Sequence, residues 1–226
     1  MDQKNKNFKE QFYLILTGIF IASLVASNLI FQKFFRWNFL GIDFELSVGI
    51  IAYPVTFLVT DLISELYGQK RANQVVVSGF FASVFTTLLV LISVNATAAQ
   101  WSPIDNVTFT KVFGLTGPAF FASMVAYLTA QLIDVRIFHF WKRLTKGKYL
   151  WLRNNASTMF SQLVDTSVIL IILCSAGVIE WERFYSLWMM GWLFKVLVAL
   201  IDTPIIYFAL WALKDKIQPT SYLEEH

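Results

Sequence analysis

Apolar residues occur along this chain in six long runs that are separated by short polar segments. The runs cover residues 12–31, 47–67, 74–95, 115–140, 156–179 and 186–213. An α-helix needs about 20 mostly apolar residues to cross the hydrocarbon core of a bilayer. The pattern predicts an all-α, polytopic membrane protein with six transmembrane helices. The connections are short, so we expect residues 1–226 to form a single membrane domain.

The composition agrees with a membrane protein and excludes an ordinary soluble domain. Hydrophobic residues make up 57% of the chain and charged residues 15%, whereas soluble domains have about 25% charged residues. The mean hydropathy is +0.59. The run 12–31 exceeds the roughly 7–15 apolar residues of a signal peptide, so we interpret it as the first span.

The distribution of basic residues predicts the orientation of the helices, because Lys and Arg are enriched in cytoplasmic loops. With a cytoplasmic N-terminus, twelve basic residues fall on the inner side: Lys4, Lys6, Lys9, Lys70, Arg71, Lys142, Arg143, Lys146, Lys148, Arg153, Lys214 and Lys216. Four fall on the outer side: Lys33, Arg36, Lys111 and Arg183. We therefore expect both termini in the cytoplasm, the lipid bilayer as the surroundings, and no nucleic-acid partner.

The segments between the runs are predicted to be loops. Residues 32–46 and 96–113 are expected to form outer loops, the first with an interfacial portion. Pro54 and Pro204 are placed inside the second and sixth helices, where proline can kink a helix. The first helix carries small residues at four-residue spacing, which favour internal packing and leave contact with a separate subunit open. They are Ala22, Ser23, Ala26 and Ser27.

Polar and ionisable residues inside the predicted spans are the candidates for function, because such groups are costly in the bilayer and usually face a wet interior. They are Asn28, Asp61, Glu65, Gln131, Asp134, Arg136, Gln162, Asp165, Lys195 and Asp202. Asp61, Asp134, Asp165 and Asp202 are predicted in the cytoplasmic halves of their helices, where they can form one cluster. Lys195 is expected higher in the membrane, where it can neutralise part of that cluster or contact a substrate.

Each of these residues also has a structural interpretation. Any single aspartate can be a tie between helices, whereas the set favours a ligand or ion pathway. Arg136 is expected to snorkel to the interface. Glu65 is expected to reach the interface as well, or to pair with Lys70 or Arg71.

Motifs for catalysis, metal binding and nucleotide hydrolysis are missing from the sequence. The histidines are His139 and His226, so a His-Glu-x-x-His zinc site is excluded, and no phosphate-binding glycine loop occurs. His139 is expected at the interface. Cys174 is the single cysteine and is expected to be a core residue. We predict no enzyme, catalytic residue, metal or cofactor. A paired-aspartate protease stays formally open without a motif to support it, and transport is favoured.

Four blocks of the sequence resemble a known family. They are YPVTFLVTDLISELYG (53–68), QLIDVRIFHFWK (131–142), WLRNNASTMFSQLVDT (151–166) and LIDTP (200–204). The chain is similar to the queuosine precursor transporters, also called the vitamin uptake transporter family. The resemblance implies a six-helix protein of the bacterial inner membrane that imports 7-cyano-7-deazaguanine or 7-aminomethyl-7-deazaguanine. It also implies a bundle like the substrate-binding components of ECF vitamin importers.

The chemistry of a 7-deazaguanine gives the predicted site residues roles. A carboxylate can accept two adjacent N–H groups, a glutamine can pair with the carbonyl, and an aromatic ring such as Tyr53, Phe57 or Trp192 can stack on the flat base. The expected substrate-binding residues are Asp61, Gln131, Asp134, Gln162, Asp165, Asp202, Asn28, Glu65, Lys195 and Tyr53.

Two other functions stay open at this point. The chain can be the substrate-binding subunit of an ECF-type importer for another vitamin-like molecule, docking through the small residues of its first helix, or a membrane enzyme or structural protein. A homodimer and the source of energy for transport, including protonation of a buried aspartate, also stay open.

Overall fold

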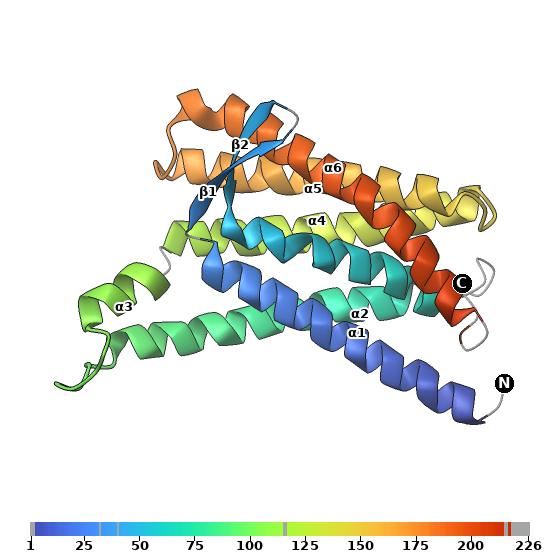
Figure 1. The fold of residues 1–226 in the computed structure, drawn as a ribbon, viewed down its shortest axis with the longest axis horizontal. Coiled ribbons are helices and arrows are strands. Elements are labelled where there is room, and N and C mark those ends of the chain that lie inside the picture. Colours follow the sequence, from blue (N-terminus) through green and yellow to red (C-terminus); the bar gives the residue numbers. More distant parts are fainter. Residues whose placement is uncertain (1–2, 32, 40, 115–116, 215–216, 218–226) are drawn as a thin grey trace.

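The computed structural model describes residues 3–31, 33–39, 41–114, 117–214 and 217, and shows an almost entirely helical fold (Figure 1). The helices are α1 (Gln3–Ile30), η1 (Val48–Ile51, a 3₁₀ helix), α2 (Tyr53–Asn95), α3 (Asn106–Phe113), α4 (Gly117–Leu144), α5 (Leu150–Ser175) and α6 (Trp181–Leu213). Two antiparallel strands, β1 (Phe34–Phe39) and β2 (Ile42–Ser47), form a hairpin between α1 and η1.

The long helix α2 reverses direction at Gly68, whose φ of 82° and ψ of 173° are non-helical. Just beyond it, Arg71 lies against Tyr13 in the first half of α1, whereas Gly79 lies against Phe20 and Leu24 further along α1. At the other end of α2, η1 lies beside the last turn of α1. The two halves of α2 therefore run antiparallel (Figure 1). Glycine is suited to this position because its positive φ carries no side-chain clash.

The prolines behave differently from each other. Pro54 lies in the first turn of α2, where a missing N–H breaks no intrahelical hydrogen bond. Pro54 therefore belongs to the second helix, as predicted, but to its first turn, and the break in α2 occurs at Gly68 instead. Pro204 lies inside α6, as predicted.

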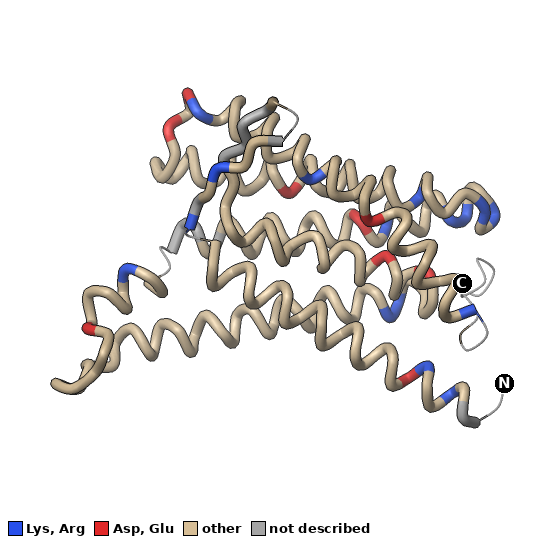
Figure 2. The backbone as a smooth tube through the Cα atoms, viewed as in Figure 1, with Lys and Arg blue, Asp and Glu red and all other residues tan. Residues whose placement is uncertain are grey.

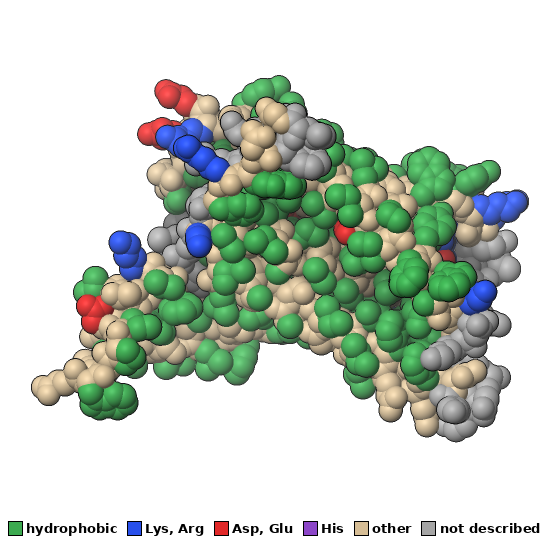
Figure 3. Space-filling model, viewed as in Figure 1, with side chains coloured by type: hydrophobic (Ala, Val, Ile, Leu, Met, Phe, Trp, Pro, Cys, Tyr) green, Lys and Arg blue, Asp and Glu red, His purple; other side chains and the backbone are tan. Residues whose placement is uncertain are grey.

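Four helical segments are long and apolar enough to cross a membrane within the described residues: Asn5–Ile30, Val48–Asn95, Leu150–Ser175 and Trp181–Leu213. Large apolar side chains such as Phe81, Ile92 and Phe208 are exposed on the sides of the bundle. Figure 3 shows hydrophobic side chains along the visible flank and most charged side chains at the two ends. The length of these segments and their apolar flanks indicate a multi-pass membrane protein.

Both predicted outer loops contain regular structure. Residues 34–39 and 42–47 form the strands of the β hairpin, and Gly41 adopts a φ of 80° between them. The hairpin packs on α6 through Trp37 and Phe194, whose ring centroids are 5.8 Å apart. In the second loop, α3 is capped by Asp105, whose Oδ1 accepts a hydrogen bond from the Thr108 N–H at 2.7 Å. These short elements have no long apolar run, so the hydropathy pattern does not indicate them.

Some helix ends also differ from the prediction. α1 begins at Gln3 instead of residue 12, and α5 spans Leu150–Ser175 instead of 156–179. The polar run from Arg153 to Asn155 interrupts the apolar pattern, which therefore predicts a loop there. It is nevertheless helical and buried, because its side chains find polar partners inside the bundle.

The core lies between α1, α2 and α4. Phe20, Ile63, Val75 and Tyr127 are fully buried there, and the Tyr127 hydroxyl donates a hydrogen bond to the Val76 carbonyl at 2.8 Å. This packing positions the first half of α2, which carries Tyr53, Asp61 and Glu65, against α4 and α5.

Candidate functional site

A cavity of about 580 Å³ opens at the hairpin end of the bundle. Its walls come from the last turns of α1, the β hairpin, the starts of α2 and α4, the second half of α5 and the first half of α6. The chain termini belong to the opposite ends of α1 and α6 (Figure 1). The lining is mostly apolar, with side chains such as Phe31, Ile50, Ile169 and Leu187. Its size falls within the roughly 300–1,000 Å³ of small-molecule sites.

An ion pair between α5 and α6 forms the polar centre of this cavity. Lys195 Nζ lies 2.5 Å from Asp165 Oδ2 and 3.2 Å from Thr166 Oγ1. The Tyr53 hydroxyl donates to Asp165 Oδ1 at 2.9 Å, and the Lys195 ammonium stands 5.3 Å from the centre of the Tyr53 ring. Lys195 thus pairs with Asp165, one of the four aspartates that it was expected to neutralise in part.

A second polar pair stands on the wall formed by α1 and α4. Ser123 Oγ donates to Asn28 Oδ1 at 3.0 Å. The Asn28 amide nitrogen is buried and has no hydrogen-bond partner within the described part of the chain. Both residues line the cavity, so a second wall of the cavity also presents a polar group among apolar side chains.

Next to the cavity, a narrow pocket of about 10 Å³ lies between α2, α5 and α6. Tyr53 and Lys195 line both spaces, and Gln162 and Asp202 line the pocket. The Gln162 Oε1 atom is buried without a donor among the described residues. A volume of this size holds about one water molecule, so Gln162 and Asp202 are close to the cavity but closed off from a larger ligand.

Asp61 on α2 and Asp134 on α4 form a deeper carboxyl pair. They are 2% and 0% exposed, and their carboxyl groups contact each other. Thr158 donates to Asp61 Oδ2 at 3.3 Å, and Ser161 donates to Asp134 Oδ1 at 2.8 Å. Two carboxyl groups in contact in a dry site can share one proton.

Gln131 on α4 is hydrogen-bonded to α2. Its Nε2 donates to Thr56 Oγ1 at 3.2 Å, and its Oε1 accepts from Thr60 Oγ1 at 3.3 Å. The residue is fully buried and both ends of its amide are engaged by protein. It therefore holds two helices together in this structure instead of lining the cavity.

At the end of the bundle where the chain termini lie, which we call the terminus end, Glu65 forms a buried ionic cluster with two cations. Glu65 Oε1 lies 2.6 Å from Arg153 Nη2, and Glu65 Oε2 lies 3.6 Å from Lys142 Nζ. Arg153 also donates to the carbonyls of Gly147 and Lys148 at 3.0 Å. Figure 2 shows acidic and basic positions inside the bundle near this end.

Two expectations about this end are corrected. Glu65 does not pair with Lys70 or Arg71. Its ion-pair partners are Lys142 on α4 and Arg153 on α5. Arg71 pairs with Glu10 on α1 at 3.3 Å. His139, which was expected at the interface, is fully buried, because this part of α4 packs inside the bundle. Arg136 is exposed, as expected.

The structure divides the predicted set of polar residues by depth instead of gathering four carboxylates at one level. Tyr53, Asn28, Asp165 and Lys195 line the cavity, whereas Gln162 and Asp202 line the pocket below it. Asp61, Asp134 and Gln131 are buried deeper, and Glu65 lies beyond them. Asp165 departs from the predicted cluster because antiparallel packing brings it beside Tyr53, two helical turns before Asp61.

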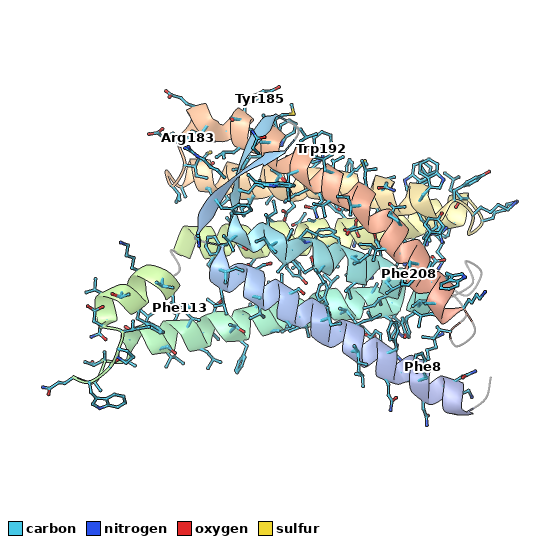
Figure 4. All side chains as sticks on the ribbon, in the orientation of Figure 1. Phe8, Phe113, Arg183, Tyr185, Trp192 and Phe208 are labelled. Carbon is cyan, nitrogen blue, oxygen red and sulfur yellow. The ribbon has the colours of Figure 1, made fainter. Side chains whose placement is uncertain are left out.

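Sequence reasoning missed several of the contacting residues. Arg153 and Lys142 were counted as loop charges, although the polar run that begins at Arg153 was a usable signal. Ser123, Thr158 and Ser161 were not identified, because hydroxyl side chains are common in membrane helices and do not by themselves indicate a site. Trp192, a proposed stacking residue, donates its indole N–H to the Met159 carbonyl at 3.0 Å and is not part of the cavity wall. Figure 4 shows it on α6 beside the hairpin.

The sequence matches the model of a known protein family. A family model described as "Putative vitamin uptake transporter" matches residues 47–209. That range includes the polar residues of the cavity and of the deeper levels, except those on α1.

Curated relatives match over much of the chain. A protein named "Probable queuosine precursor transporter" from Bacillus subtilis (strain 168) is 28% identical over 164 residues, or 72% of this chain and 71% of the relative. One named "Queuosine precursor transporter" from Escherichia coli (strain K12) is 26% identical over 202 residues, or 88% of this chain and 85% of the relative. No solved structure gives a significant match.

Proposed function

The chain belongs to the "Putative vitamin uptake transporter" family, and on that premise we propose that it imports queuosine precursors across a bacterial inner membrane. The substrates are 7-cyano-7-deazaguanine, 7-aminomethyl-7-deazaguanine or both. The names of the Bacillus subtilis and Escherichia coli relatives support the substrate class. The observation that carries the proposal is the cavity of about 580 Å³ with the Asp165–Lys195 pair in its wall.

The cavity suits a flat, mostly apolar base with one polar edge. Its walls are largely apolar, and Tyr53 presents a ring at the point where the ion pair stands. A base that stacks on Tyr53 would bring its polar edge to Asp165 and Lys195. Hydrogen bonds in such a place discriminate strongly, because a ligand without matching groups would leave buried polar atoms unsatisfied.

For the topology we propose six membrane crossings with both termini in the cytoplasm and all of residues 1–226 in a single membrane domain. The crossings are α1, the two antiparallel halves of α2, α4, α5 and α6. The reversal at Gly68 and the excess of basic residues at the terminus end support this arrangement (Figure 2). We propose that the bundle is of the type found in ECF substrate-binding components.

In this orientation the cavity opens outward and the inner end is closed. The Glu65–Arg153–Lys142 cluster joins α2, α4 and α5 there, and Arg153 also holds the α4–α5 loop. Between the cavity and this cluster lie Gln162, Asp202, Asp61 and Asp134, which form a polar column through the bundle. Import would require the inner cluster to separate while the outer mouth closes. The substrate leaves chemically unchanged, because transport is the only step.

The test is uptake of radiolabelled 7-cyano-7-deazaguanine and 7-aminomethyl-7-deazaguanine into proteoliposomes that contain the purified chain. We expect uptake above protein-free liposomes, and loss of uptake in Asp134→Ala and Asp165→Ala with normal membrane insertion. Uptake that appears only with an added energising module would establish the ECF-type subunit instead. Normal uptake by both variants would remove the site assignment, and no uptake of either base would overturn the proposed function.

A further inference from the structure

Lys195 is the one basic residue among the described residues that line the cavity. Among the described residues that line the cavity, charge is carried by Asp165 and Lys195. Lys195 also lines the narrow pocket below. Its side chain is 13% exposed and that of Asp165 is 8% exposed. A ligand that fills the cavity therefore meets the ammonium group of Lys195 at the inner end.

The hydrogen bonds of the ion pair leave a donor for the ligand. Asp165 accepts from Tyr53 through one oxygen and from Lys195 through the other. Lys195 donates to Asp165 and to Thr166, and an ammonium group has three N–H donors. One N–H of Lys195 is therefore left over, while each oxygen of Asp165 already accepts one hydrogen bond from the protein and keeps a second lone pair. The pair presents a donor to the cavity.

The charge of the wall also disfavours a cationic ligand. The Asp165–Lys195 pair is neutral as a unit, and most of the remaining lining is apolar. Placing an additional charge in such surroundings costs desolvation energy without a free counter-ion. The Asp202 carboxylate could attract a cation, but it lines the pocket of about 10 Å³, which holds only about one water molecule.

We propose that Lys195 is the specificity-determining residue of the cavity and selects an uncharged planar ligand that carries a hydrogen-bond acceptor on its substituent. This inference rests on the proposed function. Of the two deazaguanines, the 7-cyano compound is uncharged and its nitrile nitrogen is an acceptor. The 7-aminomethyl compound carries an ammonium group at neutral pH, which has no lone pair for Lys195 and is repelled by it. The 7-cyano compound is therefore the preferred substrate.

The test is the ratio of initial uptake rates of the two compounds, measured at equal concentrations in proteoliposomes. We expect the wild-type chain to favour the 7-cyano compound about tenfold or more. Lys195→Met removes both the charge and the donor, and should lower the ratio at least tenfold. Lys195→Arg keeps a cation and a donor, and should retain most of the preference. Arg183→Met is the matched control, because Arg183 lies on the same helix with a side chain that is 72% exposed.

Unpairing Asp165 could disturb folding of Lys195→Met, so Asp165→Asn/Lys195→Met provides a version without either charge. Because uptake is expected to depend on Asp165, the double variant is compared by direct binding of the two compounds to the purified protein, where it should also lack the preference for the 7-cyano compound. Equal uptake of both compounds by the wild-type chain, or an unchanged ratio in the Lys195 variants that insert normally, would overturn the inference and leave the proposed function standing. Failure of the wild-type chain to take up either compound would overturn both.

Discussion

Replacing Glu65 with glutamine should destabilise the protein more than any single change to an exposed charge. The variant keeps the size of the side chain but removes the negative charge that faces Arg153 and Lys142, at 2.6 and 3.6 Å. At an effective dielectric constant of about 20, charges at these separations attract by roughly 5 kcal/mol each. Arg153 and Lys142 are each 1% exposed. Breaking a buried pair by removing one partner typically costs about 3–5 kcal/mol, and we expect a loss in that range.

A matched control is present in the same molecule. Glu10 on α1 pairs with Arg71 on α2 at 3.3 Å, but the two side chains are 59% and 43% exposed. Exposed pairs contribute about 0–1 kcal/mol, so Glu10→Gln should be nearly neutral. The free energy of unfolding can be measured by titrating micelles of the purified protein with sodium dodecyl sulfate and following the fluorescence of its eight tryptophans. Equal effects of Glu65→Gln and Glu10→Gln would refute the reasoning about the buried cluster.

Two further predictions concern glycines and use the same unfolding measurement. Gly68→Ala places a side chain at φ 82°, ψ 173° and should cost about 1–3 kcal/mol, whereas Gly18→Ala, whose Cβ would meet nothing within 4 Å, should be neutral or stabilising. A neutral Gly68→Ala would show that the reversal does not depend on glycine. Gly79→Ala would bring Cβ to 2.6 Å from Phe20 Cε1 and 2.8 Å from the Tyr127 hydroxyl oxygen, and should cost about 1–3 kcal/mol by overpacking. Gly191→Ala, with its nearest neighbour at 3.7 Å, is the tolerated counterpart, and similar values for the two would argue against close packing at Gly79.

The long helices were predictable because their apolar runs are visible in the local composition. Each predicted run lies largely within one helical segment of the structure, and the gap between residues 67 and 74 corresponds to the reversal at Gly68. The β hairpin and α3 were not predictable in this way. Their stability depends on contacts such as Trp37 with Phe194 and on the Asp105 cap, which leave no periodic apolar signal.

The sequence by itself determined which polar residues lie among apolar ones, since a charged group in a hydrophobic run is visible without any structure. Their partners were decided by the tertiary structure. Lys195 meets Asp165 and Glu65 meets Arg153 because the rotation and offset of packed helices set which side chains face each other. Hydropathy is a property of one helix at a time, whereas an ion pair or a cavity wall depends on several helices together.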